Sequence, residues 1–366
     1  MKFECLSERL LNALNKGYKI ASKNLTLPVL QCFLITAKDN SINIKSTNLN
    51  LGFEMVVPAK VIKEGVAAVP AQLLTSYISA ISSEKSVICE LDGGVMKVLT
   101  SKGSSSIKTL PYEDFPLLPP TEKDNGFEID SKDLLSGLKS TVWSSSNTSI
   151  KPELNSVFVH FPPGGVCFAA TDSFRLAEKT ISMKIKSGIQ SFLIPSGNTL
   201  DIIRIFEGVE DKIKVFVSKN QISFIAGNIY VVSRNIDGNF PDYKRLIPKE
   251  SLTEALLLKQ DLINVLRITQ IFSDKANQLE FIVEPKKKRL SVRAGNLQDG
   301  ETAEEVKGTV GGEDVDAKFS QRYIADCLSS ISSDSVVLSF NGPEKPLKIS
   351  GAGDSSFAYI VMPMSR

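Results

Sequence analysis

The sequence predicts an α+β fold built from three tandem copies of one unit, in which two helices pack on antiparallel sheet. A short strand, a polar residue suited to begin a helix and an amphipathic helix recur at residues 2–20, 127–145 and 254–272. These segments begin roughly 125 residues apart, which is the length of a domain and far exceeds a solenoid repeat. A similar succession of strands and a second helix follows each of them.

The remaining elements of each copy are predicted from alternating apolar residues interrupted by Gly, Asn, Asp or Pro turns. A two-strand segment follows each first helix, at residues 30–46, 154–172 and 279–295. A strand that leads into a second helix comes next, at residues 65–82, 191–206 and 316–332. A closing group of strands ends each copy, at residues 87–110, 213–236 and 336–362.

Two proline-rich segments predict the domain boundaries. LPYEDFPLLPP at 110–120 and DGNFPDYKRLIP at 237–248 each contain Phe-Pro followed by a further proline. Proline fixes its own φ and restrains the preceding residue, so we expect stiff, extended connectors. The predicted domains are residues 1–121, 126–247 and 250–366.

The helices are predicted to bury one face and to expose a polar, mildly basic one. In the first helix, Leu10 and Leu14 fall opposite Arg9 and Lys16. The exposed faces of the three second helices are predicted to carry Gln72, Thr75, Ser76 and Ser79, then Asn198, Asp201 and Arg204, then Arg322, Asp326 and Ser329. Solvation explains any one such face, so a functional interpretation requires all six helices around one axis.

Composition excludes several classes of protein. The 366 residues are 42% hydrophobic and 23% charged, as in an ordinary globular protein. The net charge of +2 gives no bulk attraction to nucleic acid, so any such surface must arise from local arrangement. The start MKFECLSERLL lacks a signal-peptide pattern, and no apolar run of about 18 residues occurs. We therefore expect a cytoplasmic protein.

Cysteine and histidine usage leaves little room for catalysis. The five cysteines are scattered without a Cys-x-x-Cys pair and are predicted to be reduced core residues. The only histidine is His160, which excludes zinc sites that need two imidazoles and lies in an alternating strand pattern. An enzymatic alternative, a hydrolase, could use only Cys167, His160 and Asp172, and no nucleophile elbow or phosphate loop lies nearby.

Six short motifs occur in an order and spacing that resemble one known family. They are MKF at 1–3, LTLPVL at 25–30, TLPYEDFP at 109–116, ATDSFRLA at 170–177, NFPDYKRLIP at 239–248 and YIVMPM at 359–364. The chain resembles the bacterial DNA polymerase III beta subunit, or processivity clamp, over essentially its whole length.

The resemblance implies three DNA-clamp domains per subunit and a head-to-tail homodimer that closes into a ring around double-stranded DNA. Helices would line the hole and sheets would lie outside. The family has no catalytic residues, and no cofactor or metal is expected. It is loaded by an ATP-driven clamp loader and holds DNA polymerase III and other partners through a short peptide motif.

The resemblance also implies three sets of site residues. The cleft for the partner peptide would be formed by Leu154, Thr171, Ser173, Phe174, Arg175, Leu176, Pro241, Arg245, Leu246, Ile360, Val361, Met362, Pro363 and Met364. The DNA-facing residues would be Arg9, Lys16, Lys19, Lys23, Asn24, Gln72, Lys132, Lys139, Lys151, Arg204, Arg267 and Arg322. The dimer interface would include Ile107, Ile271 and Phe272.

Some positions depart from the family pattern. Phe174 stands where relatives often have histidine, and Ser173 where glycine is common, which predicts a narrower or more apolar cleft. We expect Arg175 and Arg245 to fix polar groups at the rim of the cleft. The basic turn at Lys286–Arg289 is interpreted as a solvated hairpin rather than a DNA site. A repeat protein of this fold that binds partners without enclosing DNA remains an alternative.

Overall fold

The computed structural model describes residues 1–21, 27–81, 83–122, 125–148, 150–185, 188–248, 250–296 and 300–364. Within these residues the chain forms an α+β fold of two compact units. Unit 1 comprises Met1–Leu135, Lys186–Ile189 and Gly197–Asn235. Unit 2 comprises Ser136–Ile185, Gln190–Ser196 and Ile236–Arg366.

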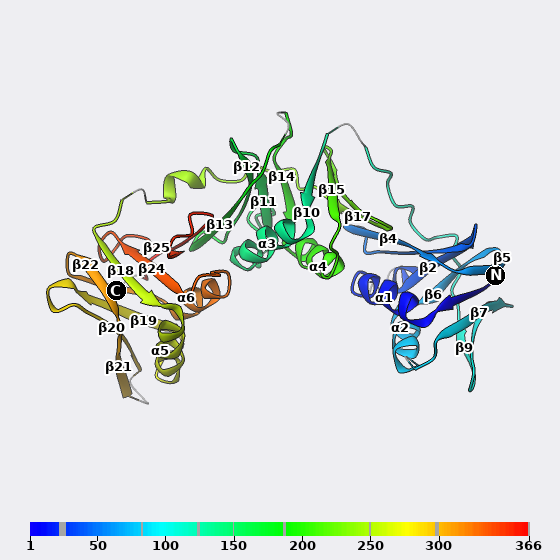
Figure 1. The fold of residues 1–366 in the computed structure, drawn as a ribbon, viewed down its shortest axis with the longest axis horizontal. Helices are drawn as coiled ribbons and strands as arrows, with labels where there is room; N and C mark the ends of the chain where they lie inside the picture. Colours follow the sequence, from blue (N-terminus) through cyan, green and yellow to red (C-terminus); the bar gives the residue numbers. More distant parts are fainter. Residues whose placement is uncertain are drawn as a thin grey trace. The chain divides into compact units, whose positions relative to one another are not determined.

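The element order repeats along the chain much as predicted (Figure 1). The first copy contains β1 (Lys2–Leu6), α1 (Ser7–Tyr18), η1 (Pro28–Gln31), β2 (Cys32–Lys38), β3 (Ser41–Thr47), β4 (Leu51–Pro58), β5 (Lys60–Lys63), β6 (Gly65–Pro70), α2 (Ala71–Ala80), β7 (Ser86–Asp92), β8 (Val95–Thr100) and β9 (Gly103–Lys108). The second contains β10 (Gly126–Asp130), α3 (Ser131–Thr141), η2 (Val142–Ser144), β11 (Ser156–His160), β12 (Gly165–Thr171), β13 (Arg175–Ser182), β14 (Phe192–Pro195), α4 (Ser196–Phe206), β15 (Lys212–Val217), β16 (Gln221–Ala226) and β17 (Ile229–Arg234). The third contains β18 (Thr253–Leu258), α5 (Lys259–Ile271), β19 (Gln278–Glu284), η4 (Pro285–Lys287), β20 (Arg289–Asn296), β21 (Gly300–Val306), β22 (Gly308–Gly312), β23 (Val315–Ser320), α6 (Gln321–Leu328), β24 (Ser335–Phe340), β25 (Leu347–Gly351) and β26 (Phe357–Val361).

The copies are joined by strand pairing across the predicted boundaries. Among the described residues, unit 1 holds the sheets β5-β1-β7-β8-β9 and β10-β15-β16-β17-β4-β3-β2-β6, and unit 2 holds β14-β11-β12-β13-β26-β25-β24-β18-β22 and β21-β20-β19-β23. Pairing of β17 with β4, with Val231 opposite Phe53, joins the second copy to the first. Pairing of β13 with β26, with Leu176 opposite Ile360, joins the third copy to the second. Backbone hydrogen bonds therefore continue from one copy into the next.

Helices pack in pairs against the sheets. In unit 1, α1 contacts α2 and also strands β3 and β4, and in unit 2, α5 contacts α6 as well as β20 and β21 (Figure 1). Gly17 allows the close approach of α1, because a Cβ at this position would lie 2.8 Å from the ring of Phe53. In unit 2, the rings of Phe281, Phe319 and Phe340 lie within 6.4 Å of one another at the centre of the core.

The two connectors differ. The first, at 110–120, has a turn closed by the Phe115 N–H, which donates to the Tyr112 carbonyl at 3.0 Å, and residues 115–120 form no regular secondary structure. Its carbonyls at Pro119 and Pro120 accept hydrogen bonds from Tyr230 Oη at 2.6 Å and Gln221 Nε2 at 2.7 Å. The second is not extended throughout, because η3 (Tyr243–Leu246) forms a turn of 3-10 helix within it. In the described part of the chain, no helix is both long and apolar enough to cross a membrane.

Candidate functional site

A tight turn between β12 and β13 in unit 2 carries several predicted cleft residues. The Asp172 carboxylate accepts hydrogen bonds at 2.9 Å from the backbone N–H groups of Phe174 and Arg175, and Thr171 Oγ1 donates to the Arg175 carbonyl at 2.6 Å. Ser173 at the tip has φ 80°, in the left-handed region that favours glycine. The strain explains why glycine is suited to this position. Phe174 is left 63% exposed.

The C-terminal strand lies beside this turn. Arg175 pairs with Val361 across the sheet, and the Met362 N–H donates to the Phe174 carbonyl at 2.8 Å. The Met364 N–H then donates to the Lys318 carbonyl at 2.8 Å, which fixes the tail beyond β26. The structure thus brings residues 171–176 and 360–364 together, as the cleft prediction requires.

The second connector covers the same region of the sheet. Tyr243, at the start of η3, is buried in an apolar cluster with Leu176 and Ile360, packed against Phe240. Leu246 remains 55% exposed. The other predicted cleft residues divide into buried Leu154 and Val361, exposed Pro241, and partly buried Pro363 and Met364.

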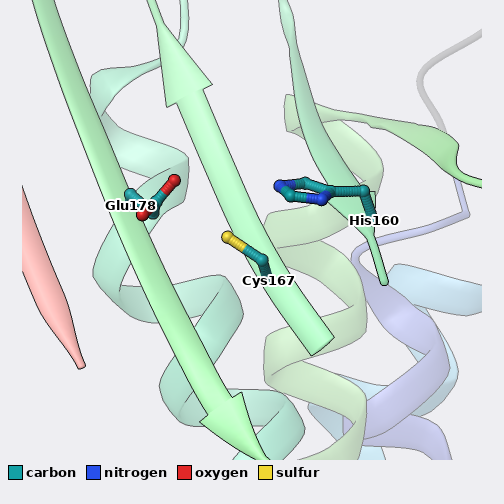
Figure 2. Close-up of side chains that lie close together, drawn as sticks. All are labelled: His160, Cys167 and Glu178. Carbon is teal, nitrogen blue, oxygen red and sulfur yellow. The ribbon is translucent and has the colours of Figure 1, made fainter. Parts of the chain in front are cut away.

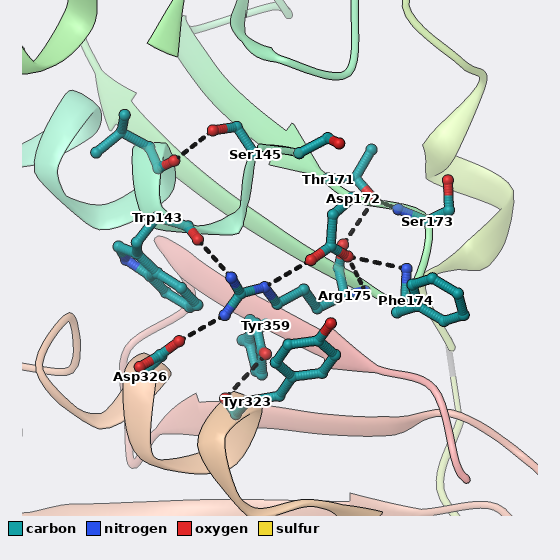
Figure 3. Close-up of polar contacts among 12 residues, drawn as sticks. Trp143, Ser145, Thr171, Asp172, Ser173, Phe174, Arg175, Tyr323, Asp326 and Tyr359 are labelled. Atoms are coloured by element: carbon teal, nitrogen blue, oxygen red, sulfur yellow. Dashed lines mark hydrogen bonds and ion pairs between the residues drawn. The ribbon is translucent and has the colours of Figure 1, made fainter. Parts of the chain in front are cut away.

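The two arginines of the predicted cleft have different roles. Arg175 is only 6% exposed, and its guanidinium donates to Asp172 Oδ2 at 2.9 Å, to Asp326 Oδ2 at 2.6 Å and to the Trp143 carbonyl at 2.7 Å (Figure 3). It also lies over the rings of Trp143, at 5.4 Å, and Tyr323, at 4.4 Å.

The expectation that Arg175 fixes polar groups at the rim is therefore wrong, because the side chain is buried and its Nε and both terminal nitrogens donate within the protein. Instead it ties the 172–174 turn to η2 and α6. Arg245 is exposed and pairs with Asp242 at 2.7 Å, so it remains accessible from solvent. Only one contact of this network could be expected from the sequence, that between Asp172 and Arg175, which are three residues apart. The contacts of Arg175 with Trp143, Tyr323 and Asp326 join distant parts of the chain and have no such signal.

The hydrolase alternative is contradicted by the geometry. The Asp172 carboxylate is engaged by Arg175 and by the backbone of its own turn, while His160 Nε2 lies 2.8 Å from Tyr243 Oη. Burial raises the pKa of the Cys167 thiol to about 11, which makes it a poor nucleophile at neutral pH. Burial also lowers the pKa of His160, with a further lowering by Lys244.

Most predicted DNA-facing residues are exposed. Those on helices are Arg9, Gln72, Lys132, Lys139, Arg204, Arg267 and Arg322; Lys19 follows α1 directly, and Lys151 lies in the turn before β11. Lys19 and Gln72 line a groove of about 790 Å³ between α1 and α2 in unit 1, and Arg267 and Arg322 line one of about 670 Å³ between α5 and α6 in unit 2. Lys23 and Asn24 lie outside the described residues.

Three positions on the predicted polar faces differ from expectation. Lys16 is half-buried, and its ammonium donates to the carbonyls of Ile205 and Glu207 at the C-terminal end of α4, where the helix dipole favours a cation. Thr75 is buried, and its hydroxyl is satisfied by donating to the Ala71 carbonyl one turn earlier, at 2.7 Å. The periodic pattern placed these side chains on the correct helices but could not predict their polar partners.

Asn198 is the third position on a predicted polar face that differs from expectation. It is 6% exposed and donates to the Asn50 carbonyl and to Ser233 Oγ at 3.0 and 2.9 Å. It therefore joins the start of α4 to the β4–β17 seam instead of facing outward.

The three residues predicted for the dimer interface differ in how exposed they are. Ile271 is 73% exposed at the end of α5, and Phe272 is partly buried beside it. Ile107 is 3% exposed and lies opposite Met96 in its own sheet, so it fills the core of unit 1 and offers no surface to a partner. The basic turn at Lys286–Arg289 is an exposed β19–β20 hairpin, with Lys287 paired to Glu284 at 2.6 Å.

Comparison with known proteins gives the relationship directly. Models of the N-terminal, central and C-terminal domains of the DNA polymerase III beta subunit match residues 1–119, 128–242 and 244–365. The beta sliding clamp of Synechococcus elongatus is 25% identical over 371 residues, which cover 100% of this chain and 99% of the relative. That of Escherichia coli K12 is also 25% identical over 371 residues, with both chains covered completely.

Solved structures share the fold. The DNA polymerase III beta subunit of Thermotoga maritima has a TM-score of 0.94 at 24% identity, covering 100% of this chain and 99% of that one. The Pseudomonas aeruginosa sliding clamp bound to griselimycin has a TM-score of 0.95 at 22% identity, covering both chains completely. Because the three domain models follow one another over almost the whole sequence, the chain belongs to the DNA polymerase III beta subunit family.

Proposed function

We propose that this chain is a cytoplasmic sliding clamp that encircles duplex DNA and tethers the replicative polymerase, giving processivity without catalysing a reaction itself. The observation that carries the proposal is the succession of three matching domain models over residues 1–119, 128–242 and 244–365. A clamp of this kind is a non-catalytic accessory subunit of DNA polymerase III. It needs a surface for DNA, a closed ring and a site for partners.

The polar helix faces are the proposed DNA surface. Duplex DNA presents a nearly continuous cylinder of phosphates, which scattered Lys, Arg and amide side chains can contact without reading bases. Exposed Lys19 and Gln72 beside one helix groove, and Arg267 and Arg322 beside another, support this assignment. The net charge of +2 is compatible with a clamp that is retained by enclosure and must still slide, but it is not evidence for one.

A head-to-tail homodimer is the proposed assembly, because a heterologous contact that closes after two subunits gives a ring. Ile271 supports it as an apolar side chain that its own domain leaves 73% exposed. Opening and closing around DNA would require an ATP-driven clamp loader. The mass in solution is expected to be near twice the 40.0 kDa of one chain, and a strict monomer at micromolar concentration would contradict the dimer.

The partner cleft is proposed at the junction of the 172–174 turn, the C-terminal tail and η3. Phe174, Leu246 and Met362, one on each of these three segments, are 63%, 55% and 40% exposed. Exposed apolar side chains that are grouped into a patch mark an interaction site, whereas single ones do not. Aromatic, leucine and methionine side chains form an adaptable surface for the hydrophobic residues of a short peptide. Phe174 in place of histidine would favour peptides with a more apolar residue at its contact.

Loading on nicked circular DNA tests enclosure. A topologically closed ring should stay on the circle in high salt and leave when the circle is cut, whereas a protein held only by surface charge dissociates steeply with salt. The second behaviour would favour the alternative of a partner-binding protein that does not enclose DNA.

Two matched sets of charge substitutions test the orientation of the helices. Neutralising Arg9, Lys19, Arg267 and Arg322 together should weaken loading. Neutralising the Lys286–Arg289 turn should leave retention and sliding largely unchanged. A severe loss of retention from the turn variant would contradict the assignment of the helices to the DNA side.

Deleting Met362–Arg366 tests the cleft. The deletion removes the N–H group that bonds to the Phe174 carbonyl and one exposed wall of the cleft. It should abolish polymerase stimulation while the dimer and its retention on DNA persist. A matched control is substitution of exposed Leu117, which is distant in sequence from the cleft residues. Normal stimulation after the deletion would refute the cleft assignment.

A further inference from the structure

Three potential metal ligands share one face of three adjacent strands. His160 on β11 lies directly opposite Cys167 on β12, and Cys167 lies opposite Thr180 on β13, two residues from Glu178. Because side chains alternate along a strand, all three potential ligands project from the same side of the sheet. Their imidazole nitrogen, thiol sulfur and carboxylate oxygen lie within 4.8 Å of one another (Figure 2).

Tyr243 adds a fourth donor from above the sheet. Its hydroxyl oxygen is 2.8 Å from His160 Nε2 and 3.6 Å from Cys167 Sγ. Around a tetrahedral zinc ion, bond lengths of about 2.1 Å to O or N and 2.3 Å to S place neighbouring O and S ligands about 3.6 Å apart and O and N ligands about 3.4 Å apart. The distance from Tyr243 Oη to Cys167 Sγ already has the value that zinc requires. The distance from Tyr243 Oη to His160 Nε2 would have to lengthen by about 0.6 Å, which breaks the hydrogen bond between them.

We propose that His160, Cys167 and Glu178, with Tyr243 Oη in the fourth position, form a binding site for a zinc-class divalent cation. Cys167 is a buried thiol in the metal-free protein, so it must release its proton to solvent when the cation binds. The resulting donor set of one imidazole, one thiolate, one carboxylate and one phenol oxygen suits zinc and cobalt, and it disfavours magnesium and calcium, which prefer oxygen ligands alone. The strands fix three of the donors before the metal arrives. None of its residues belongs to the proposed DNA-facing set, and it requires no second imidazole.

Lys244 is the group that competes with the cation. Its ammonium pairs with the Glu178 carboxylate at 2.5 Å and supplies the charge that a bound dication would replace. The Lys244 side chain is 50% exposed, so it can move into solvent when the carboxylate binds metal. Removing Lys244 should therefore raise the affinity for metal.

Binding would also hold the second connector in place. Tyr243 lies in the apolar cluster with Leu176 and Ile360, and η3 continues from it to the exposed Leu246. A metal bond to Tyr243 Oη would add to this packing. Saturating Zn²⁺ should therefore raise the thermal unfolding midpoint of the full chain, since any ligand that binds the folded state stabilises it.

The test uses the full-length protein with Zn²⁺ in competition with a chromophoric chelator, and Co²⁺ followed by its visible and thiolate charge-transfer absorption. One metal ion per chain is expected. Loss of a residue that only supports a ligand lowers metal affinity by about 10–100-fold, so His160→Gln, Cys167→Ser and Glu178→Gln, which each remove a ligand, should each lower it by at least about 100-fold. Lys244→Ala should raise the affinity for metal several-fold. Cys5→Ser, which removes another buried thiol, is the matched control and should bind as the parent does.

The single histidine supplies a second readout that does not depend on the variants. NMR of the ¹⁵N-labelled His160 ring should show the Nε2 resonance shifting on addition of Zn²⁺, and no other imidazole can contribute. An unshifted ring in Zn²⁺ would overturn the proposal. So would unchanged affinity in both the His160→Gln and Cys167→Ser proteins, if circular dichroism shows that they are folded.

Discussion

Replacing Arg175 with methionine tests the role of this side chain as a structural tie. The substitution keeps much of the apolar volume but removes three hydrogen bonds, which join Asp172, Asp326 and the Trp143 carbonyl. Removing one partner of a buried ion pair costs about 3–5 kcal/mol, because the other charge is left without compensation. Asp172 is 13% exposed and Asp326 is 35% exposed, so water can rehydrate the second carboxylate. We therefore expect a loss of about 3 kcal/mol, at the lower end of that range.

The assay is urea unfolding followed by the fluorescence of Trp143, the only tryptophan in the sequence. Its ring centroid lies 5.4 Å from the Arg175 guanidinium carbon, so its emission reports on this part of the fold. Arg245→Met is the matched control, because Arg245 is 85% exposed and its pair with Asp242 is worth about 0–1 kcal/mol. Equal midpoints for the two variants would refute the structural role of Arg175.

Three further predictions follow from backbone geometry and charge. Gly17→Ala should destabilise unit 1 by about 1–3 kcal/mol, because the new Cβ would meet the Phe53 ring at 2.8 Å. Gly197→Ala in α4, where a new Cβ would have no atom within 4 Å, should instead be neutral or stabilise by up to about 1 kcal/mol in the same denaturation measurement. Ser173→Gly should raise the free energy of unfolding by about 0.5–1 kcal/mol by relieving φ 80°, and a lowered unfolding midpoint would contradict this. For Asp354, burial would raise the pKa, but hydrogen bonds from Ser356 and the charge of Lys179 hold it below its usual value. The ionised Asp354 carboxylate therefore stabilises the fold fully at pH values above its pKa in the unfolded chain, and this stabilisation is lost as the pH falls through its lower pKa in the folded protein. Asp354→Asn should reduce the thermal unfolding midpoint more at pH 7 than at pH 3.

The buried stripes of the helices could be predicted from periodicity. Leu10 and Leu14 are buried and Arg9 and Lys19 are exposed as expected, because a 3.6-residue repeat determines which side chains can reach a sheet. Periodicity fails for polar residues at the margin of a face. Lys16 and Asn198 face carbonyl groups that are distant in sequence, at Ile205 and Asn50, and no local pattern contains that information.

The cleft residues could be named from short motifs, but their roles could not. ATDSFRLA predicted a turn with an accessible arginine. In the structure, Arg175 is buried because Asp326 and Trp143, from elsewhere in the chain, supply its acceptors. The proximity of His160, Cys167 and Glu178 depends on strand register, and so does the position of Ile107 in its own core.

The sequence by itself determined the threefold repetition of elements, the type of each major element and the family, since these depend on local periodicity, turn chemistry and motif order. Only the tertiary structure decided that strand pairing continues from copy to copy and which polar side chains are used internally. The physical reason is that cross-strand register and buried hydrogen bonds join residues far apart in the chain, and such partners are selected by the packing of the whole unit.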